Sequence, residues 1–195
     1  MKFDILIAGV GGQGTVLASR LLAAAAIKAG YYARTSETIG MAQRGGCVVS
    51  HVRIGSEEAS PIIPYGTADL LIGFEPSEAA RNINRLAPSG RSVVNTRVIK
   101  PVTASLDTVT YAIDPINAFI RTNSSETVML DGYALAEKAG SVKALNVVLL
   151  GVAAAAGFLP FDKDDLESII CENVSPRYVE LNKKAFNTGL EYKRK

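Results

Sequence analysis

A strand, a glycine-rich turn and an apolar helix open the chain, and this succession constrains the fold more than any other feature of the sequence. Lys2–Ala8 reads KFDILIA, a short run of the kind that forms a buried parallel strand. Gly9–Gly14 (GVGGQG) follows, and the small and apolar residues of Thr15–Ala29 predict a helix that packs closely on a sheet and ends at Gly30. This pattern is typical of the βαβ unit that opens a Rossmann-like domain.

Strands and helices continue to alternate along the chain, which favours a mainly parallel sheet covered on both faces. We expect an α/β fold, a Rossmann-like three-layer domain with a helical C-terminal third, and one domain over residues 1–195, since this length suits a single core. Strands are predicted at Tyr31–Ser36, Cys47–Ile54, Ala68–Phe74, Ser92–Asn95 and Thr108–Ile113, and helices at Pro76–Leu86, from Asp114, at Asp131–Lys138, at Val142–Phe158, from Asp162 or Asp164 to Asn173, and at Pro176–Asn187, with a turn at Ala87–Gly90.

The helix predicted at Val142–Phe158 is apolar on all sides, so it is expected to be buried, either in this core or against a partner subunit. Asn146 lies within it and needs a hydrogen-bond partner, most simply a structural one. The apolar run Ala144–Pro160 is shorter than the roughly 20 residues that span a bilayer. With no signal-peptide pattern at the N-terminus, the sequence predicts a cytoplasmic protein that does not bind membranes.

Charge and cysteine usage exclude several classes of function. The formal net charge is +2 and the basic residues are scattered, so no nucleic-acid partner is expected. Cys47 and Cys171 lie far apart in sequence, which leaves a disulfide framework, a zinc knuckle and a four-thiolate iron–sulfur cluster unsupported. His51 is the only histidine, so no metal site is predicted. His51 itself is either a polar residue within a strand or a group for proton transfer.

The glycine turn satisfies the pattern GxGxxG between a strand and a helix. Glycines allow positive φ angles and close approach, so backbone amides at the start of the helix can meet a phosphate or a carboxylate. Glu37 lies 23 residues after Gly14, near the place where a dinucleotide-binding domain carries an acidic residue. A nicotinamide dinucleotide site is therefore one alternative, and glycines that only let the helix pack on the strand are another.

Two features disfavour a plain dinucleotide site. Gln13 places a side-chain amide among the backbone donors of the turn, where it suits a polar group. Gln43, Arg44 and Gly45 follow soon after Glu37, and an arginine held between an amide and glycines is suited to an anion.

Several segments, taken together, resemble the gamma-type domain of 2-oxoacid:ferredoxin oxidoreductases, and within that group the small (beta) subunits of the indolepyruvate enzymes. The resemblance runs nearly from end to end, and Cys47 departs from it at a position where a small residue such as serine is expected. The segments are GVGGQG (9–14), SETIGMAQRGGCVVSHVRIG (36–55), ADLLIGFEPSEA (68–79), VVNTR (93–97), LNVVLLG (145–151) and VELNKKAFNTG (179–189).

The resemblance implies oxidative decarboxylation of an aryl 2-oxoacid such as indolepyruvate, with coenzyme A as acyl acceptor and ferredoxin as electron acceptor. It also implies a complex in which a large (alpha) subunit carries thiamine diphosphate, magnesium and the iron–sulfur clusters. This chain has too few cysteines for a cluster and no GDG with a downstream Asn to hold magnesium diphosphate. It is therefore expected to be inactive alone.

Within such a complex, the glycine turn and the QRGG loop are expected to face the partner and to help receive coenzyme A or the 2-oxoacid carboxylate. Glu75 and Asn95 follow predicted strands, where open parallel sheets bind ligands, although capping and turn hydrogen bonds explain them equally well. No catalytic residue is assigned. The expected binding residues are Gly9, Gly11, Gly12, Gln13, Gly14, Ser36, Glu37, Gln43, Arg44, Gly45, Glu75 and Asn95. A free-standing NAD(P)-binding oxidoreductase module and a non-catalytic small-anion binding protein remain as alternatives.

Overall fold

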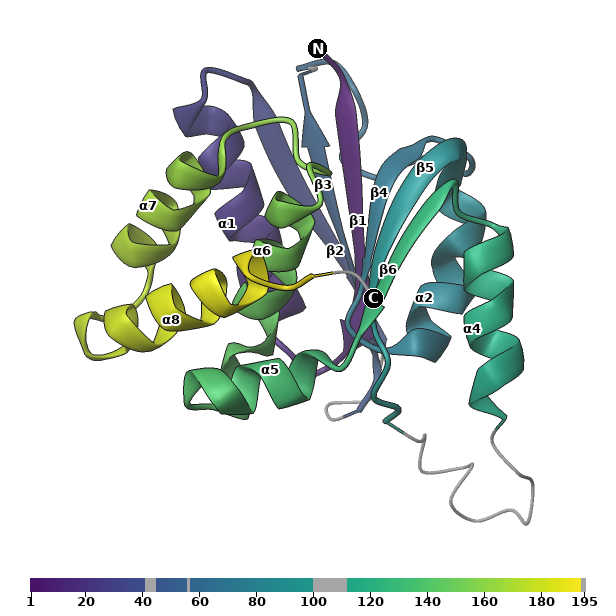
Figure 1. Ribbon diagram of the computed structural model, residues 1–195. Coiled ribbons are helices and arrows are strands. Elements are labelled where there is room, and N and C mark those ends of the chain that lie inside the picture. Colours follow the sequence, from purple (N-terminus) through teal and green to yellow (C-terminus); the bar gives the residue numbers. More distant parts are fainter. Residues whose placement is uncertain (41–44, 56, 100–111, 194–195) are drawn as a thin grey trace.

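A twisted sheet with helices on both faces forms the protein (Figure 1). This computed structural model describes residues 1–40, 45–55, 57–99 and 112–193. Helices α1, α5, α6, α7 and α8 cover one face of the sheet, and α2 and α4 cover the other (Figure 1). The strands are β1 (Phe3–Val10), β2 (Ala33–Ile39), β3 (Cys47–Ile54), β4 (Ala68–Gly73), β5 (Leu86–Asn95) and β6 (Glu126–Leu130); the helices are α1 (Thr15–Lys28), α2 (Pro76–Asn82), α4 (Ile113–Thr122), α5 (Gly132–Ala139), α6 (Leu145–Ala155), α7 (Lys163–Asn173) and α8 (Val179–Leu190).

The strand order within the described residues is β2-β3-β1-β4-β5-β6. Strands β1, β4, β5 and β6 run parallel to one another, while β3 pairs antiparallel with both β1 and β2. The predicted mainly parallel α/β sheet is thus confirmed. The predicted simple βαβ opening is wrong in one respect, because β3 lies between β1 and β2 and the two strands of that unit are not neighbours.

Alternation along β1 divides the core into two layers. Ile5 and Ile7 point toward α1, α6 and α8, and Leu6 and Ala8 point toward α2 and α4; all four side chains are fully buried. Successive residues of a strand face opposite sides of a sheet, so a strand that is apolar throughout has to be covered on both faces. This confirms the interpretation of the first strand.

Helix α6 belongs to this core. Leu145 to Ala153 are buried without interruption, and α6 packs so closely on α8 that an added Cβ at Gly151 would lie 2.3 Å from the carbonyl oxygen of Phe186. The core alternative for the apolar C-terminal helix therefore holds. The helix is shorter than predicted, because a 3₁₀ turn at Val142–Ala144 precedes it and Gly157, with φ of 67°, follows its end.

The second half of the sheet differs from the prediction at two places. The predicted helix end at Leu86 and turn at Ala87–Gly90 are part of β5, where Gly90 is needed because a Cβ would lie 2.6 Å from the Leu86 side chain. The predicted strand Thr108–Ile113 is wrong at Ile113, which begins α4, and residues 108–111 lie outside the described part of the chain. The sixth strand is instead Glu126–Leu130, which the prediction missed.

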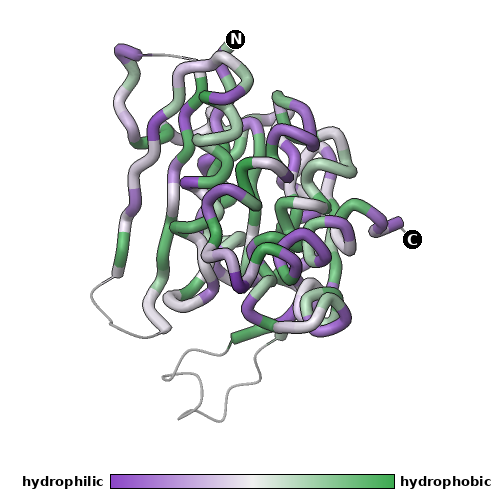
Figure 2. Tube along the Cα trace, turned by 90° about the vertical axis from the view of Figure 1, so that its left-hand side faces the viewer, coloured by the Kyte–Doolittle hydropathy of each residue, from purple (hydrophilic) through white to green (hydrophobic). Residues whose placement is uncertain are grey.

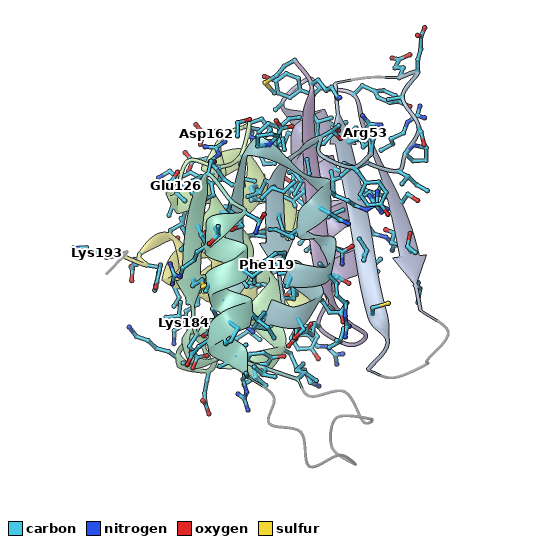
Figure 3. The ribbon with its side chains drawn as sticks, turned by 90° about the vertical axis from the view of Figure 1, so that its right-hand side faces the viewer. Arg53, Phe119, Glu126, Asp162, Lys184 and Lys193 are labelled. Carbon is cyan, nitrogen blue, oxygen red and sulfur yellow. The ribbon has the colours of Figure 1, made fainter. Side chains whose placement is uncertain are left out.

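A buried ion pair ties β1 to β3 near the end of the sheet where β1 begins. Asp4 and Arg53 are paired residues of the two strands, and the guanidinium donates to the carboxylate through Nε–Oδ1 at 2.9 Å and Nη2–Oδ2 at 3.1 Å. Figure 3 labels Arg53 in the upper part of the sheet. Two parallel hydrogen bonds fix the register of neighbouring strands. Among the described helices, none combines the length and apolar character needed to cross a membrane.

Candidate functional site

The parallel strands β1, β4, β5 and β6 all end at one edge of the sheet, which is the lower edge in Figure 1. The glycine turn follows β1, Glu75 follows β4, Asn95 ends β5 and Asp131 follows β6. Open parallel sheets bind ligands outside this carboxyl edge. The candidate site is therefore built from the segments that leave these strand ends.

Close packing explains two glycines of the turn. A Cβ at Gly9 would lie 2.9 Å from Cβ of Phe74, and a Cβ at Gly14 would lie 2.9 Å from Nδ2 of Asn146. Gly14 also has φ of 84°, which disfavours a side chain. Gly9 and Gly14 thus fit the interpretation that the glycines allow close packing around the turn.

The other two glycines of the turn, Gly11 and Gly12, are less crowded, and a Cβ added at Gly11 would lie 3.8 Å from the carbonyl oxygen of Gly46. Gly12 has φ of 97°, and an added Cβ there would meet no atom within 4 Å. The N–H of Gly11 donates to the carbonyl of Gly46 at 2.9 Å, so the turn is joined to the segment that leads into β3. Gly12 thus leaves the outer face of the turn bare, as close approach of a ligand requires.

The start of α1 is uncapped. Gly14 stands at the N-cap, no side chain of the described residues caps the first-turn N–H groups, and the first turn contains no acidic residue. The first N–H groups of a helix have no acceptor within the helix and carry the positive end of its dipole. This end of α1 has the chemistry of an anion-binding site.

The Gln13 carboxamide, which the motif predicted to bond a polar group, forms its hydrogen bonds within the protein. Its side chain is 8% exposed, Oε1 accepts from the N–H of Val10 at 2.8 Å, and Nε2 donates to the carbonyl of Phe74 at 3.0 Å and to the hydroxyl of Tyr133 at 3.2 Å. One side chain therefore joins the turn to the end of β4 and to α5. Gln13 holds the shape of the turn.

Asn95 has a similar bracing role. Its fully buried carboxamide donates through Nδ2 to the Phe74 carbonyl at 2.9 Å and accepts through Oδ1 from the N–H of Gly132 at 3.0 Å. The Phe74 carbonyl thus receives hydrogen bonds from both Gln13 and Asn95. These contacts fit the interpretation of Asn95 as a residue that makes structural hydrogen bonds at the strand end.

Glu75 caps α2 and is almost completely buried, at 1% exposure. Its Oε2 accepts from the N–H of Glu78 at 2.9 Å, while burial raises the pKa of Glu75 above its ordinary value. Burial also raises the pKa of Glu78, which the nearby Arg81 guanidinium opposes. The buried Ser77 Oγ and Glu78 Oε2 have no hydrogen-bond partner in the described structure. This edge therefore contains unsatisfied polar atoms near α2.

Arg97 is a candidate binding residue that the sequence analysis did not select. It follows β5, is exposed, and holds its guanidinium 4.8 Å from the centre of the Tyr133 ring, the same tyrosine that receives the Gln13 hydrogen bond. Stacking on an aromatic face limits the orientations of an arginine and leaves its N–H groups at the rim for an anion. The sequence signal that could have identified Arg97 is its place two residues after the predicted strand end at Asn95, in the segment VVNTR.

Ser36 and Glu37 lie on β2, away from the glycine turn in the sheet order. They pair with His51 and Ser50 of β3, and Glu37 Oε1 accepts from Ser19 Oγ of α1 at 3.3 Å. Dinucleotide-binding domains take their acidic residue from the strand beside the first one. Here β3 occupies that place, so Glu37 lacks the relation to the turn that a dinucleotide site requires.

Gly45, with φ of 69°, is open on the side where a Cβ would stand, so the backbone there is accessible. Gln43 and Arg44, which were expected to contact an anion, lie outside the described residues.

His51 is buried within β3. It is 1% exposed, Nδ1 accepts from the N–H of Ile63 at 3.2 Å, and burial, helped by the charges of Arg85 and Arg53, lowers its pKa to about 4. A group with this pKa is neutral at physiological pH and accepts a hydrogen bond there. The interpretation of His51 as a polar residue within a strand fits this environment.

Thiols and carboxylates are scattered. Cys47 is exposed at the start of β3 and Cys171 lies on α7. Over the ranges that the structure describes, no three His, Cys, Asp or Glu side chains stand close enough together to hold a metal ion. At the carboxyl edge, backbone amides, carboxamides and an arginine lie alongside the carboxyl groups of Glu75 and Asp131.

Fold and site together define a class of protein: an α/β domain whose carboxyl edge carries a glycine turn at the start of α1 and an arginine stacked on a tyrosine. The family model described as pyruvate ferredoxin/flavodoxin oxidoreductase matches residues 4–192. The chain belongs to this family, and the resemblance seen in its motifs is confirmed.

Individual relatives agree with this assignment. The chain is 40% identical to the indolepyruvate oxidoreductase subunit IorB of Archaeoglobus fulgidus, over 97% of this chain and 94% of that protein. It is 38% identical to the subunit IorB of Pyrococcus horikoshii, over 97% and 95% of the two chains. The crystal structure of the keto/oxoacid ferredoxin oxidoreductase gamma subunit from Geobacter sulfurreducens is similar with a TM-score of 0.69 and 27% identity, over 97% of this chain and 96% of that one.

Proposed function

We propose that this chain is the small subunit of a cytoplasmic oxidoreductase that oxidatively decarboxylates aryl 2-oxoacids, indolepyruvate among them, to acyl-coenzyme A and reduces ferredoxin. The observation that carries the proposal is the identity of 40% with a subunit of an indolepyruvate oxidoreductase over nearly the full length of both chains. A larger partner subunit completes the enzyme.

The donor set of this chain supports a division of labour between the subunits. Iron–sulfur clusters require several thiolates at one place, whereas Cys47 and Cys171 lie on β3 and α7. The described carboxylates do not gather into a group that fits a divalent cation. We therefore assign thiamine diphosphate, its magnesium ion and the clusters to the large subunit, where the thiamine would supply the carbanion chemistry that decarboxylation needs.

This chain contributes anion recognition at the carboxyl edge. The first-turn N–H groups of α1 and the bare backbone of Gly12 form one contact for a phosphate of coenzyme A or the carboxylate of the 2-oxoacid. The Arg97 guanidinium, stacked on Tyr133, forms a second. Arg44, beside Gln43, is proposed as a third. Charged hydrogen bonds of this kind orient a substrate before the reaction.

The remaining candidates are assigned supporting roles. Gln13 and Asn95 hold the turn and the strand ends in place through the shared Phe74 carbonyl. Ser36, Glu37, Gly45 and Glu75 are proposed to shape the pocket or to dock the partner subunit.

Expression with and without the large subunit tests the proposal. We expect a stable complex whose reduction of viologen depends on indolepyruvate and coenzyme A, and no turnover by this chain alone. Turnover by the chain alone, with only thiamine diphosphate added, would contradict the division of labour. Micromolar NAD or NADP binding that Glu37→Gln abolishes would instead support a dinucleotide-binding module.

A further inference from the structure

A cavity of about 340 Å³ opens within the helical layer, between α1, the start of α6 and the connection from α7 to α8. Figure 2 looks at this layer from outside, and Figure 1 shows α1, α6, α7 and α8 meeting on that side of the sheet. The lining residues are Leu17, Ser141, Lys143, Ala144, Asn146, Asn173, Val174, Ser175, Tyr178, Leu181 and Asn182. Cavities of this size are typical of sites for small organic molecules.

Asn146 forms the wall nearest to the glycine turn and is the first sign that the cavity takes a ligand. Its side chain is 4% exposed and makes no hydrogen bond to any described residue, although its Nδ2 lies close to Gly14. Buried polar side chains are nearly always hydrogen-bonded. Because Asn146 lines the cavity, its carboxamide is available to donate to and accept from a ligand there.

Two more asparagine side chains line the same cavity. Asn173 donates through Nδ2 to the carbonyl of Ile169, and Asn182 donates through Nδ2 to the carbonyl of Tyr178, so the Oδ1 atom of each remains an acceptor. Together with Asn146, the cavity offers several acceptors and one unused amide donor. A nitrogen heterocycle presents ring N–H, amino and ring nitrogen groups that match such carboxamides.

The other walls suit a flat apolar surface. Leu17, Val174 and Leu181 line the cavity, and so does Tyr178, which is 44% exposed. The Arg177 guanidinium lies 4.6 Å from the centre of the Tyr178 ring and covers one of its faces, so a ligand can stack only on the other. Leucine and valine side chains pack on both faces of an aromatic ring, and tyrosine stacks on it. This combination favours a planar ring over a flexible polar chain.

The charge of the cavity points to one anionic group. Lys143 is exposed at the rim, forms no ion pair within the described chain, and is the only charged residue among those that line the cavity. An unopposed ammonium group at the mouth of an apolar site attracts a carboxylate or a phosphate.

We propose that this cavity binds a planar nitrogen heterocycle that carries one anionic group, such as a purine nucleoside monophosphate or an indole carboxylate. The ring lies between Leu17 and Tyr178 with its polar edge on Asn146, and the anion pairs with Lys143. The site is separate from the carboxyl edge of the sheet. The two are connected by Asn146, whose side chain lines the cavity and also packs against Gly14. The inference does not depend on the proposed function, because binding to the full chain is measured without turnover.

Calorimetric titration of the full chain tests the proposal with two probes, AMP and indole-3-acetate. We expect at least one to bind about tenfold more tightly than either adenosine or inorganic phosphate, since ring and anion are both needed. Which probe binds distinguishes the nucleotide from the indole source. Lys143→Ala and Tyr178→Ala should each weaken binding about five- to tenfold, whereas Lys184→Ala, an exposed lysine of α8 that does not line the cavity, should leave it unchanged.

Asn146→Ala should weaken binding most, and the Lys143→Ala and Tyr178→Ala variants keep the test decisive if this buried variant fails to fold. Absence of binding by both probes would overturn the proposal. So would binding with the same dissociation constant in the wild type, Lys143→Ala and Tyr178→Ala, because the probe would then sit elsewhere.

Discussion

The Asn146 carboxamide lies directly against Gly14, so that a Cβ added to this glycine would come within 2.9 Å of Nδ2. Helix α6 therefore supports the start of α1 from behind, 132 residues away along the sequence. The glycine turn owes its shape to this contact as well as to its own φ angles. A change in the packing of α6 is therefore expected to change the conformation of the glycine turn.

Gly14→Ala is expected to lower the free energy of unfolding by about 2–4 kcal/mol, because it combines a positive φ with a clash. Gly12→Ala is the matched control: it also has a positive φ but meets no atom within 4 Å, so about 1 kcal/mol is expected. Urea unfolding measures both. In the double variant Gly14→Ala with Asn146→Ala, the two losses should be less than additive. Equal losses for Gly14→Ala and Gly12→Ala would show that the Asn146 contact is unimportant.

Gln13→Ala removes three hydrogen bonds at once and leaves the buried Phe74 carbonyl with fewer donors. We expect a loss of about 2–3 kcal/mol in the free energy of unfolding, the usual cost of unpaired buried polar groups. Tyr133→Phe removes only the hydroxyl acceptor at 3.2 Å and should cost about 1 kcal/mol or less. A loss for Tyr133→Phe as large as that for Gln13→Ala would mean that the contacts to Val10 and Phe74 contribute little.

The lowered pKa of His51 leads us to expect a loss of stability in mild acid. The unfolded chain protonates this histidine below its ordinary pKa of 6.5, but the folded protein does so only near a pKa of about 4. Protons therefore favour the unfolded state as pH falls from 6.5 to 4, at a cost of about 3 kcal/mol over the window. His51→Asn, which keeps an acceptor for the Ile63 N–H, should flatten this part of the stability curve. An unchanged slope between pH 6.5 and 4 would contradict a neutral buried imidazole.

Glu75 predicts the opposite dependence on pH. Burial raises the pKa of this carboxyl, so the folded state holds the proton more tightly than the unfolded state, and stability is lost as pH rises from the ordinary value of 4.5 through the raised one. Glu75→Gln should therefore gain stability relative to wild type above that window and show no gain at lower pH. Denaturant midpoints at a series of pH values measure this.

Glu172 is the matched control on the surface. A hydrogen bond from Ser168, with the charge of Lys28, lowers its pKa, so its contribution is present at neutral pH and is lost as pH falls through the lowered value. Glu172→Gln should consequently lose stability at neutral pH and converge with wild type in acid. Curves of the same sign for Glu75→Gln and Glu172→Gln would refute the assigned environments.

Local pattern predicted much of the fold because several elements are defined by their own residues. The apolar run of β1, the glycines after it and the small residues of α1 specify a strand, a turn and a buried helix without distant information. The insertion of β3 between β1 and β2 could not be predicted in this way, since the residues of β3 suit a parallel or an antiparallel neighbour equally. The short β6 likewise gains its identity from pairing with β5.

The sequence indicates which segments follow the strand ends, but it does not show the contacts that their side chains make. Gln13 was identified from the motif, but its partners Phe74 and Tyr133 lie 61 and 120 residues away, so its bracing role is visible only in three dimensions. The same holds for Arg97, which acquires its orientation from Tyr133. Sequence spacing indicates which residues reach a strand end, whereas packing decides which of them face inward.

Arg97→Ala gives a direct test of anion recognition at the carboxyl edge. The guanidinium is exposed over Tyr133, so its removal should change the free energy of unfolding by less than about 1 kcal/mol. In the complex with the large subunit, the KM for coenzyme A or for indolepyruvate should rise about tenfold or more with a smaller change in kcat, the cost of one charged hydrogen bond used in binding. Arg97→Lys keeps the charge but loses the planar fork, so an intermediate KM is expected. Arg121→Ala at the end of α4, on the opposite helical layer, is the control and should leave both constants unchanged. If the KM values for both substrates stay at the wild-type level in Arg97→Ala, this arginine does not bind the anion. Of the two anion contacts proposed within the described residues, only the start of α1 would then remain.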